Sequence, residues 1–245
     1  MIVLRVIVNA LILAVEIGLA AGAAWLGLHH PLWFAGLTAA LAFLIGLRLE
    51  YLRLEHELPF YFDRPPGRGW LLARPVALVE ALVKGILAGI VAILTFSGTD
   101  ANRLYWTAII FGVAVFVGSS LLRRISISLA ARPSRWGYFR LAAPLGLVFS
   151  LALIALPSAS FSDVGWKLIF DLPAKPSLEQ ASEVLFLLKQ KFDELVALLL
   201  SALMPKEWAR VVGALASVNV MTGFVIAIYA ALAAEVVCIL DDTLP

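Results

Sequence analysis

Charged residues are scarce in this sequence of 245 residues: Asp, Glu, Lys and Arg together account for 15% of it, and hydrophobic residues for 62%. A water-soluble domain is about one-quarter charged, so this composition excludes an ordinary soluble protein. The mean hydropathy of +0.96 points the same way. The composition therefore predicts an integral membrane protein.

Residues that build catalytic and metal centres are also few. The single cysteine, Cys238, excludes an intrachain disulfide and a thiolate metal site. His29 and His30 are adjacent, but without nearby carboxylates or cysteines they make a poor ligand set. The sequence has no glycine-rich phosphate loop, His-Glu zinc motif or serine elbow. This favours a non-enzymatic role, and we expect no cofactor, no metal and no nucleic-acid partner.

Long apolar segments are what the sequence has instead. A helix of about 20 apolar residues crosses a bilayer, and six segments separated by polar or proline-containing connections approach or exceed that length. The predicted spans are residues 4–28, 32–47, 75–96, 104–122, 141–161 and 211–240. The fold class is therefore all-α, with residues 1–245 forming a single polytopic domain of six transmembrane helices.

The tryptophans support these span boundaries independently. Indole rings concentrate at headgroup depth, where one end is apolar and the other is wet. All seven tryptophans lie at predicted span ends and none lies mid-span: Trp25, Trp33, Trp70, Trp106, Trp136, Trp166 and Trp208.

The distribution of arginine predicts the orientation. Ten of the thirteen arginines flank the second and fourth connections, which the positive-inside rule makes cytoplasmic. Both termini are then cytoplasmic, and residues 162–207 form an extracytoplasmic insertion, as in a bacterial inner-membrane protein. Eight of these arginines are candidates to bind anionic lipid headgroups or an acidic cytoplasmic partner: Arg64, Arg68, Arg74, Arg123, Arg124, Arg132, Arg135 and Arg140.

The insertion contains an amphipathic segment at residues 177–204. Ser177 and Gln180 form a capping box at its start, and leucines then recur at spacings of three and four. The pattern predicts a helix that lies on the membrane surface or on a partner protein rather than crossing the bilayer. Its candidate partner-facing residues are Leu185, Leu188, Phe192 and Leu195.

Five charged residues fall inside predicted spans: Arg5 and Glu235 lie nearer span ends, and the other three are candidates for an ion or proton site or for helix pairing. Glu80 and Lys84 are four residues apart in the third span, in the order that suits a helical ion pair, and Glu16 is near the centre of the first span. If the first and third spans touch, Glu16 and Glu80 can share Lys84, and the surplus acid can carry a proton. The alternative is a static contact that fixes how helices pair.

Two functional hypotheses follow. The leading one is a non-catalytic membrane subunit packed among other subunits of a larger complex, since intramembrane polar groups are few and small residues such as Gly85 and Gly89 favour tight helix contacts. The alternative is a small proton- or ion-coupled transporter that uses Glu16, Glu80 and Lys84. Both place membrane lipids, and the first also other membrane proteins, among the partners.

Overall fold

The computed structural model describes residues 2–61, 69–97, 101–129, 132–133, 140–155 and 218–243, and the single positions 184, 205, 208 and 212. All regular structure in these ranges is helical. In chain order the elements are α1 (Ile2–His29), α2 (Pro31–Tyr61), α3 (Gly69–Thr95), α4 (Ala101–Leu129), α6 (Ala142–Ala155), the short 3₁₀ helix η1 (Val218–Met221) and α10 (Thr222–Thr243).

Across the described residues, the prediction of an all-helical fold is confirmed. Five of these helices are long and apolar enough to cross a bilayer. Their apolar parts are Val6–His29, Pro31–Leu54, Arg74–Thr95, Ala101–Ser128 and Thr222–Asp241. The count of six spans stays a prediction. At the predicted fifth span, α6 has 14 residues, and residues 156–161 lie outside the described ranges.

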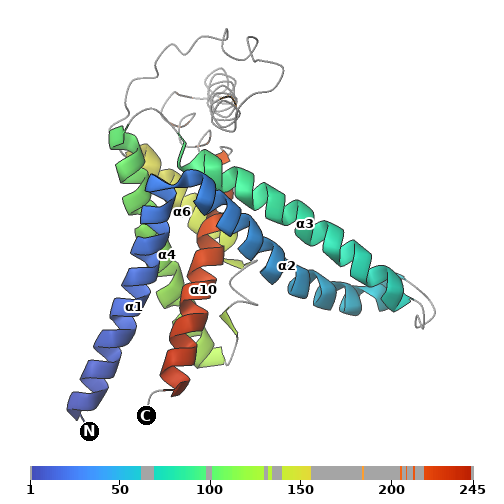
Figure 1. The fold of residues 1–245 in the computed structure, drawn as a ribbon, viewed down its shortest axis with the longest axis horizontal. Helices are drawn as coiled ribbons and strands as arrows, with labels where there is room; N and C mark the ends of the chain where they lie inside the picture. The colour runs from blue at the N-terminus through green and yellow to red at the C-terminus, as the bar shows by residue number, and fades with distance from the viewer. Residues whose placement is uncertain are drawn as a thin grey trace.

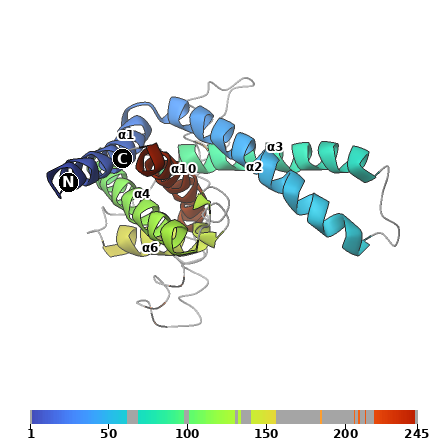
Figure 2. The ribbon, with the colours of Figure 1, turned by 90° about the horizontal axis from the view of Figure 1, so that it is seen from below.

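The helices are arranged as a bundle with a projecting hairpin. Helices α1, α4, α6 and α10 pack together, whereas α2 and α3 lie against each other and diverge from the bundle along their length (Figures 1 and 2). The first residues of α1 and the last of α10 lie at the same end of the bundle (Figure 1). This hairpin of α2 and α3 is called the α2–α3 hairpin below.

Aromatic rings join the base of the α2–α3 hairpin to the bundle. Phe34 of α2 stacks on Tyr229 of α10, with ring centroids 5.2 Å apart, and meets Phe96 and Phe111 edge-on. The Thr38 hydroxyl lies 3.0 Å from the Tyr229 hydroxyl, so this buried phenol has a hydrogen-bond partner. Large rings with a satisfied polar atom hold this end of the structure together.

Glycines set the closest helix contacts. A Cβ atom at Gly85 would lie 3.0 Å from the carbonyl oxygen of Ala39, and one at Gly89 would lie 3.1 Å from the Ala39 Cβ. The tight interface predicted on the third span is therefore formed, with α2 as the partner. At the crossing of α6 and α10, added Cβ atoms on Gly146 and Gly223 would collide with backbone atoms of the opposing segment.

Candidate functional site

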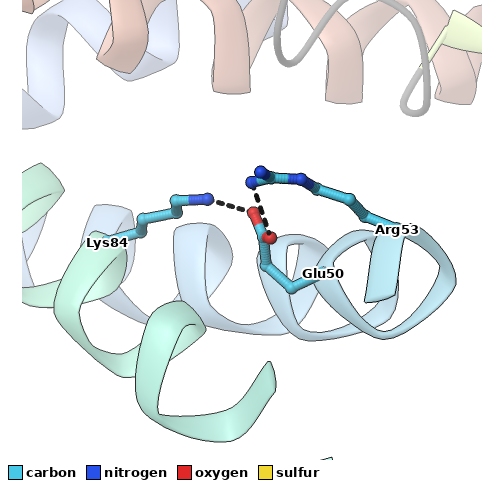
Figure 3. Close-up of polar contacts among 3 residues, drawn as sticks. All are labelled: Glu50, Arg53 and Lys84. Carbon is cyan, nitrogen blue, oxygen red and sulfur yellow. Dashed lines mark hydrogen bonds and ion pairs between the residues drawn. The ribbon is translucent and has the colours of Figure 1, made fainter. Parts of the chain in front are cut away.

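The α2–α3 hairpin buries a carboxylate at membrane depth. Glu50 of α2 has no exposed surface, and the Lys84 ammonium of α3 donates a hydrogen bond to its Oε1 (Figure 3). Arg53, one turn further along α2, places Nη1 3.5 Å from Oε2 of Glu50. The close glycine contacts of α3 with α2 bring the two helices near enough for this interhelical pair.

Glu80 completes the charged group in the hairpin. It lies one turn before Lys84 on α3, near the carboxyl of Glu50. Lys84 and Arg53 both pair with Glu50, which is the arrangement that makes a buried charge tolerable. The four residues Glu50, Arg53, Glu80 and Lys84 are called the hairpin cluster.

Glu16 occupies a second site, between α1 and α4. It is 2% exposed, and the hydroxyls of Ser119 and Ser120 both contact its Oε1, the Ser120 oxygen at 2.9 Å. The Ser119 hydroxyl also contacts the carbonyl oxygen of Phe116 at 2.9 Å. Within the described residues Glu16 takes part in none of the ion pairs. Glu16, Ser119 and Ser120 are called the Glu16 site.

The structure thus divides the three predicted intramembrane residues between two places. Glu80 and Lys84 lie one turn apart on α3, and the ion pair shown for Lys84 is with Glu50, so a Glu80–Lys84 pair stays a prediction. Glu16 does not share Lys84. Helix α1 packs chiefly on α4, α10 and α2, whereas the Lys84 ammonium bonds to Glu50 of α2. Hydropathy shows which segments enter the membrane and carries no information on which of them are neighbours.

Glu50 was missed by the sequence reasoning because the predicted second span ended at residue 47. The candidate span of α2 continues to Leu54 and so includes Glu50. Its spacing of three residues from Arg53 is the available signal, since that spacing puts both side chains on one helical face.

Most of the predicted arginine sites are exposed where they are described. Arg123 lies partly buried and pairs with Asp241 of α10 at 3.4 Å, at the end of the bundle near both termini. The exposed ones are Arg74, Arg124, Arg132 and Arg140. Outside the described residues lie Arg64, Arg68, Arg135, Leu185, Leu188, Phe192 and Leu195. Binding of lipid or partner by all of these stays a prediction.

Across the described ranges, no group of three or more His, Cys, Asp or Glu side chains is arranged to hold a metal ion. Comparison with protein-family models, with curated proteins and with solved structures found no match for this chain. Function is therefore inferred from the geometry of the hairpin cluster and the Glu16 site.

Proposed function

We propose that this chain is a non-catalytic subunit of a larger membrane-protein complex. In this proposal it lies in a bacterial-type cytoplasmic membrane, with six spans and both termini cytoplasmic. The observation that carries the proposal is the α2–α3 hairpin, a membrane-length arm that leaves the bundle and bears partly exposed charges (Figure 1).

The depth of these charges supports a protein neighbour. Glu80 and Lys84 lie six and ten residues into the apolar part of α3, which corresponds to about 9 and 15 Å along the helix axis. The Lys84 side chain is 30% exposed, and that of Arg53, one residue from the end of the candidate span of α2, is 52% exposed. A charged group facing lipid at the depth of Lys84 is costly, and intramembrane charges usually face protein or water. A neighbouring subunit with polar groups supplies such a cover.

The direction of the charges supports a docking position beside α10. On α2, Leu49 packs in the same small cluster as Leu232 of α10, and Arg53 follows Leu49 by one turn on the same face. On α10, Glu235 follows Leu232 by three residues. Charged residues thus follow the apolar contacts between the α2–α3 hairpin and α10. We propose that a transmembrane helix of the neighbouring subunit lies beside these charged residues.

The exposed arginines support a second contact. Arg124, Arg132 and Arg140 belong to the side expected to be cytoplasmic, where anionic headgroups attract basic residues. The same residues suit an acidic cytoplasmic segment of a partner. Either contact would strengthen the position of the chain in the complex without any chemistry.

The alternative is a proton- or ion-coupled transporter. The observation in its favour is Glu16, a carboxyl buried in the middle of a membrane helix. Against it, Glu50 of the hairpin cluster pairs with Lys84 and Arg53 within one hairpin, an arrangement suited to fixing helix positions.

The test is purification of the tagged chain in mild detergent, followed by mass spectrometry of the proteins that accompany it. The subunit proposal expects a defined set of membrane proteins at fixed stoichiometry. Recovery of the chain alone, or only with copies of itself, would count against the proposal and favour transport.

A matched pair of variants locates the contact. Arg53→Gln removes an exposed cation from the hairpin cluster, and Arg48→Gln removes an exposed cation from the same helix, outside this group. We expect the first variant to lose its companions in mild detergent and the second to retain them. Equal retention by the two variants would remove the hairpin cluster from the proposed interface.

A further inference from the structure

The Glu16 site has more hydrogen-bond contacts than its two serine hydroxyl protons can supply. The Ser119 hydroxyl carries a single proton, yet its oxygen contacts two acceptors, Oε1 of Glu16 and the carbonyl oxygen of Phe116. The Ser120 hydroxyl also contacts Oε1 and supplies its own proton there. If Glu16 is a carboxylate, Ser119 must divide one proton between two acceptors in a buried site.

One further proton satisfies every contact. When Glu16 is a carboxylic acid, Ser120 donates to Oε1, the acid O–H on Oε1 donates to the Ser119 oxygen, and Ser119 donates to the Phe116 carbonyl. Each proton is then used once, in a continuous chain of three hydrogen bonds. Such chains strengthen their members in a medium of low dielectric constant.

The surroundings of Glu16 favour the same state. The residue is 2% exposed in the middle of α1, where an ionised carboxyl with only hydroxyl partners is costly. On α4, Arg123 lies one turn beyond Ser119, but its guanidinium pairs with Asp241 of α10. Glu235 of α10 is an acid and offers no neutralising charge. Glu50 and Arg53 of α2 pair with each other, and Glu50 also pairs with Lys84 of α3.

We infer that Glu16 carries a proton in the folded chain, held between α1 and α4 by Ser119 and Ser120. Release of this proton leaves a charge between two packed helices. Protonation of Glu16 is thus linked to the packing of α1 on α4, and the site is independent of the docking role proposed for the α2–α3 hairpin.

The experiment is infrared spectroscopy of the full chain in lipid bilayers at neutral pH, since the C=O stretch of a protonated carboxyl is separate from the bands of a carboxylate. We expect this stretch in the unaltered protein and its loss in Glu16→Gln, whose amide has the same shape. Glu50→Gln, which alters the ion-paired carboxylate, should retain the band. Identical spectra of the unaltered protein and Glu16→Gln in this region would overturn the inference.

A second pair of variants keeps Glu16 in place. Ser119→Ala removes the acceptor of the acid proton, so the C=O band should move to higher frequency. Thr38→Val removes another buried hydroxyl, which contacts Tyr229 and Phe34, and should leave the band where it is. A band that does not respond to Ser119→Ala would disprove the proposed hydrogen-bond chain, even if Glu16→Gln misfolds.

Discussion

Glu50 and Glu16 are both buried carboxyls on membrane-length helices, and their neighbours differ completely. Glu50 is fully buried against Lys84 and Arg53, whereas Glu16 is 2% exposed and contacts two serine hydroxyls. The first site is neutralised by opposite charges. The second, as we infer, is neutralised by a proton.

Neutralisation by an ion pair and neutralisation by a proton require different neighbouring side chains. An ion pair requires two long side chains from different helices to meet, and removing one partner leaves an uncompensated charge. A protonated acid requires only short hydroxyl partners, and each hydrogen bond has a modest net value of about 1 kcal/mol. The hairpin cluster should therefore be the more sensitive of the two sites to substitution.

The largest expected effect is that of Lys84→Met. It leaves Glu50 buried without its interhelical partner, and we expect a loss of about 3–5 kcal/mol in the free energy of unfolding. Denaturant titration in mixed micelles measures this loss. The double variant Glu50→Leu with Lys84→Met should recover most of the stability, because it removes both charges. A double variant as unstable as Lys84→Met alone would contradict the ion-pair explanation.

A smaller loss of stability is expected when a larger side chain at Gly85 pushes α2 and α3 apart. In Gly85→Leu, the new side chain meets the Ala39 carbonyl oxygen and the Phe43 side chain, and we expect a cost of about 1–3 kcal/mol. The control is Gly18→Leu on α1, where an added Cβ meets no atom within 4 Å. Denaturant titration measures both variants. Equal losses of stability in Gly85→Leu and Gly18→Leu would contradict a close contact between α2 and α3 at Gly85.

At the Glu16 site, Ser120→Ala removes one donor to Oε1. The expected loss of stability is about 1 kcal/mol, the net value of one hydrogen bond. Ser128→Ala removes an exposed hydroxyl that bonds to its own helix, and should change stability by less than about 0.5 kcal/mol. Equal effects of the two substitutions would show that the Ser120 contact contributes nothing.

The smallest effect is expected for Glu16→Gln. The amide can accept from Ser120 and donate to Ser119, so stability should change by less than about 1 kcal/mol. Glu50→Gln should cost more, because Lys84 then loses its carboxylate partner at membrane depth. If Glu16→Gln proved the more destabilising of the two, Glu16 would have to be charged and the contrast between the sites would disappear.

The membrane character and most helix positions were predictable from the sequence. Apolar segments of sufficient length and interfacial tryptophans located the helices, and Trp25, Trp33 and Trp106 are indeed exposed at helix ends. The interface on Gly85 and Gly89 was also predictable, because small residues four apart permit close approach. The end of the span in α2 was not, since hydropathy declines gradually there: the predicted span ends at residue 47, whereas the candidate span runs to Leu54.

By itself, then, the sequence determined that this chain forms helices long and apolar enough to cross a membrane and that Glu16, Glu80 and Lys84 lie within them. The tertiary structure alone decided that Lys84 meets Glu50 and that Glu16 meets Ser119 and Ser120. The physical reason is that insertion depends on the apolarity of each segment, a local property. Neighbours in the membrane are chosen by packing between residues distant in sequence, such as the 103 positions that separate Glu16 from Ser119.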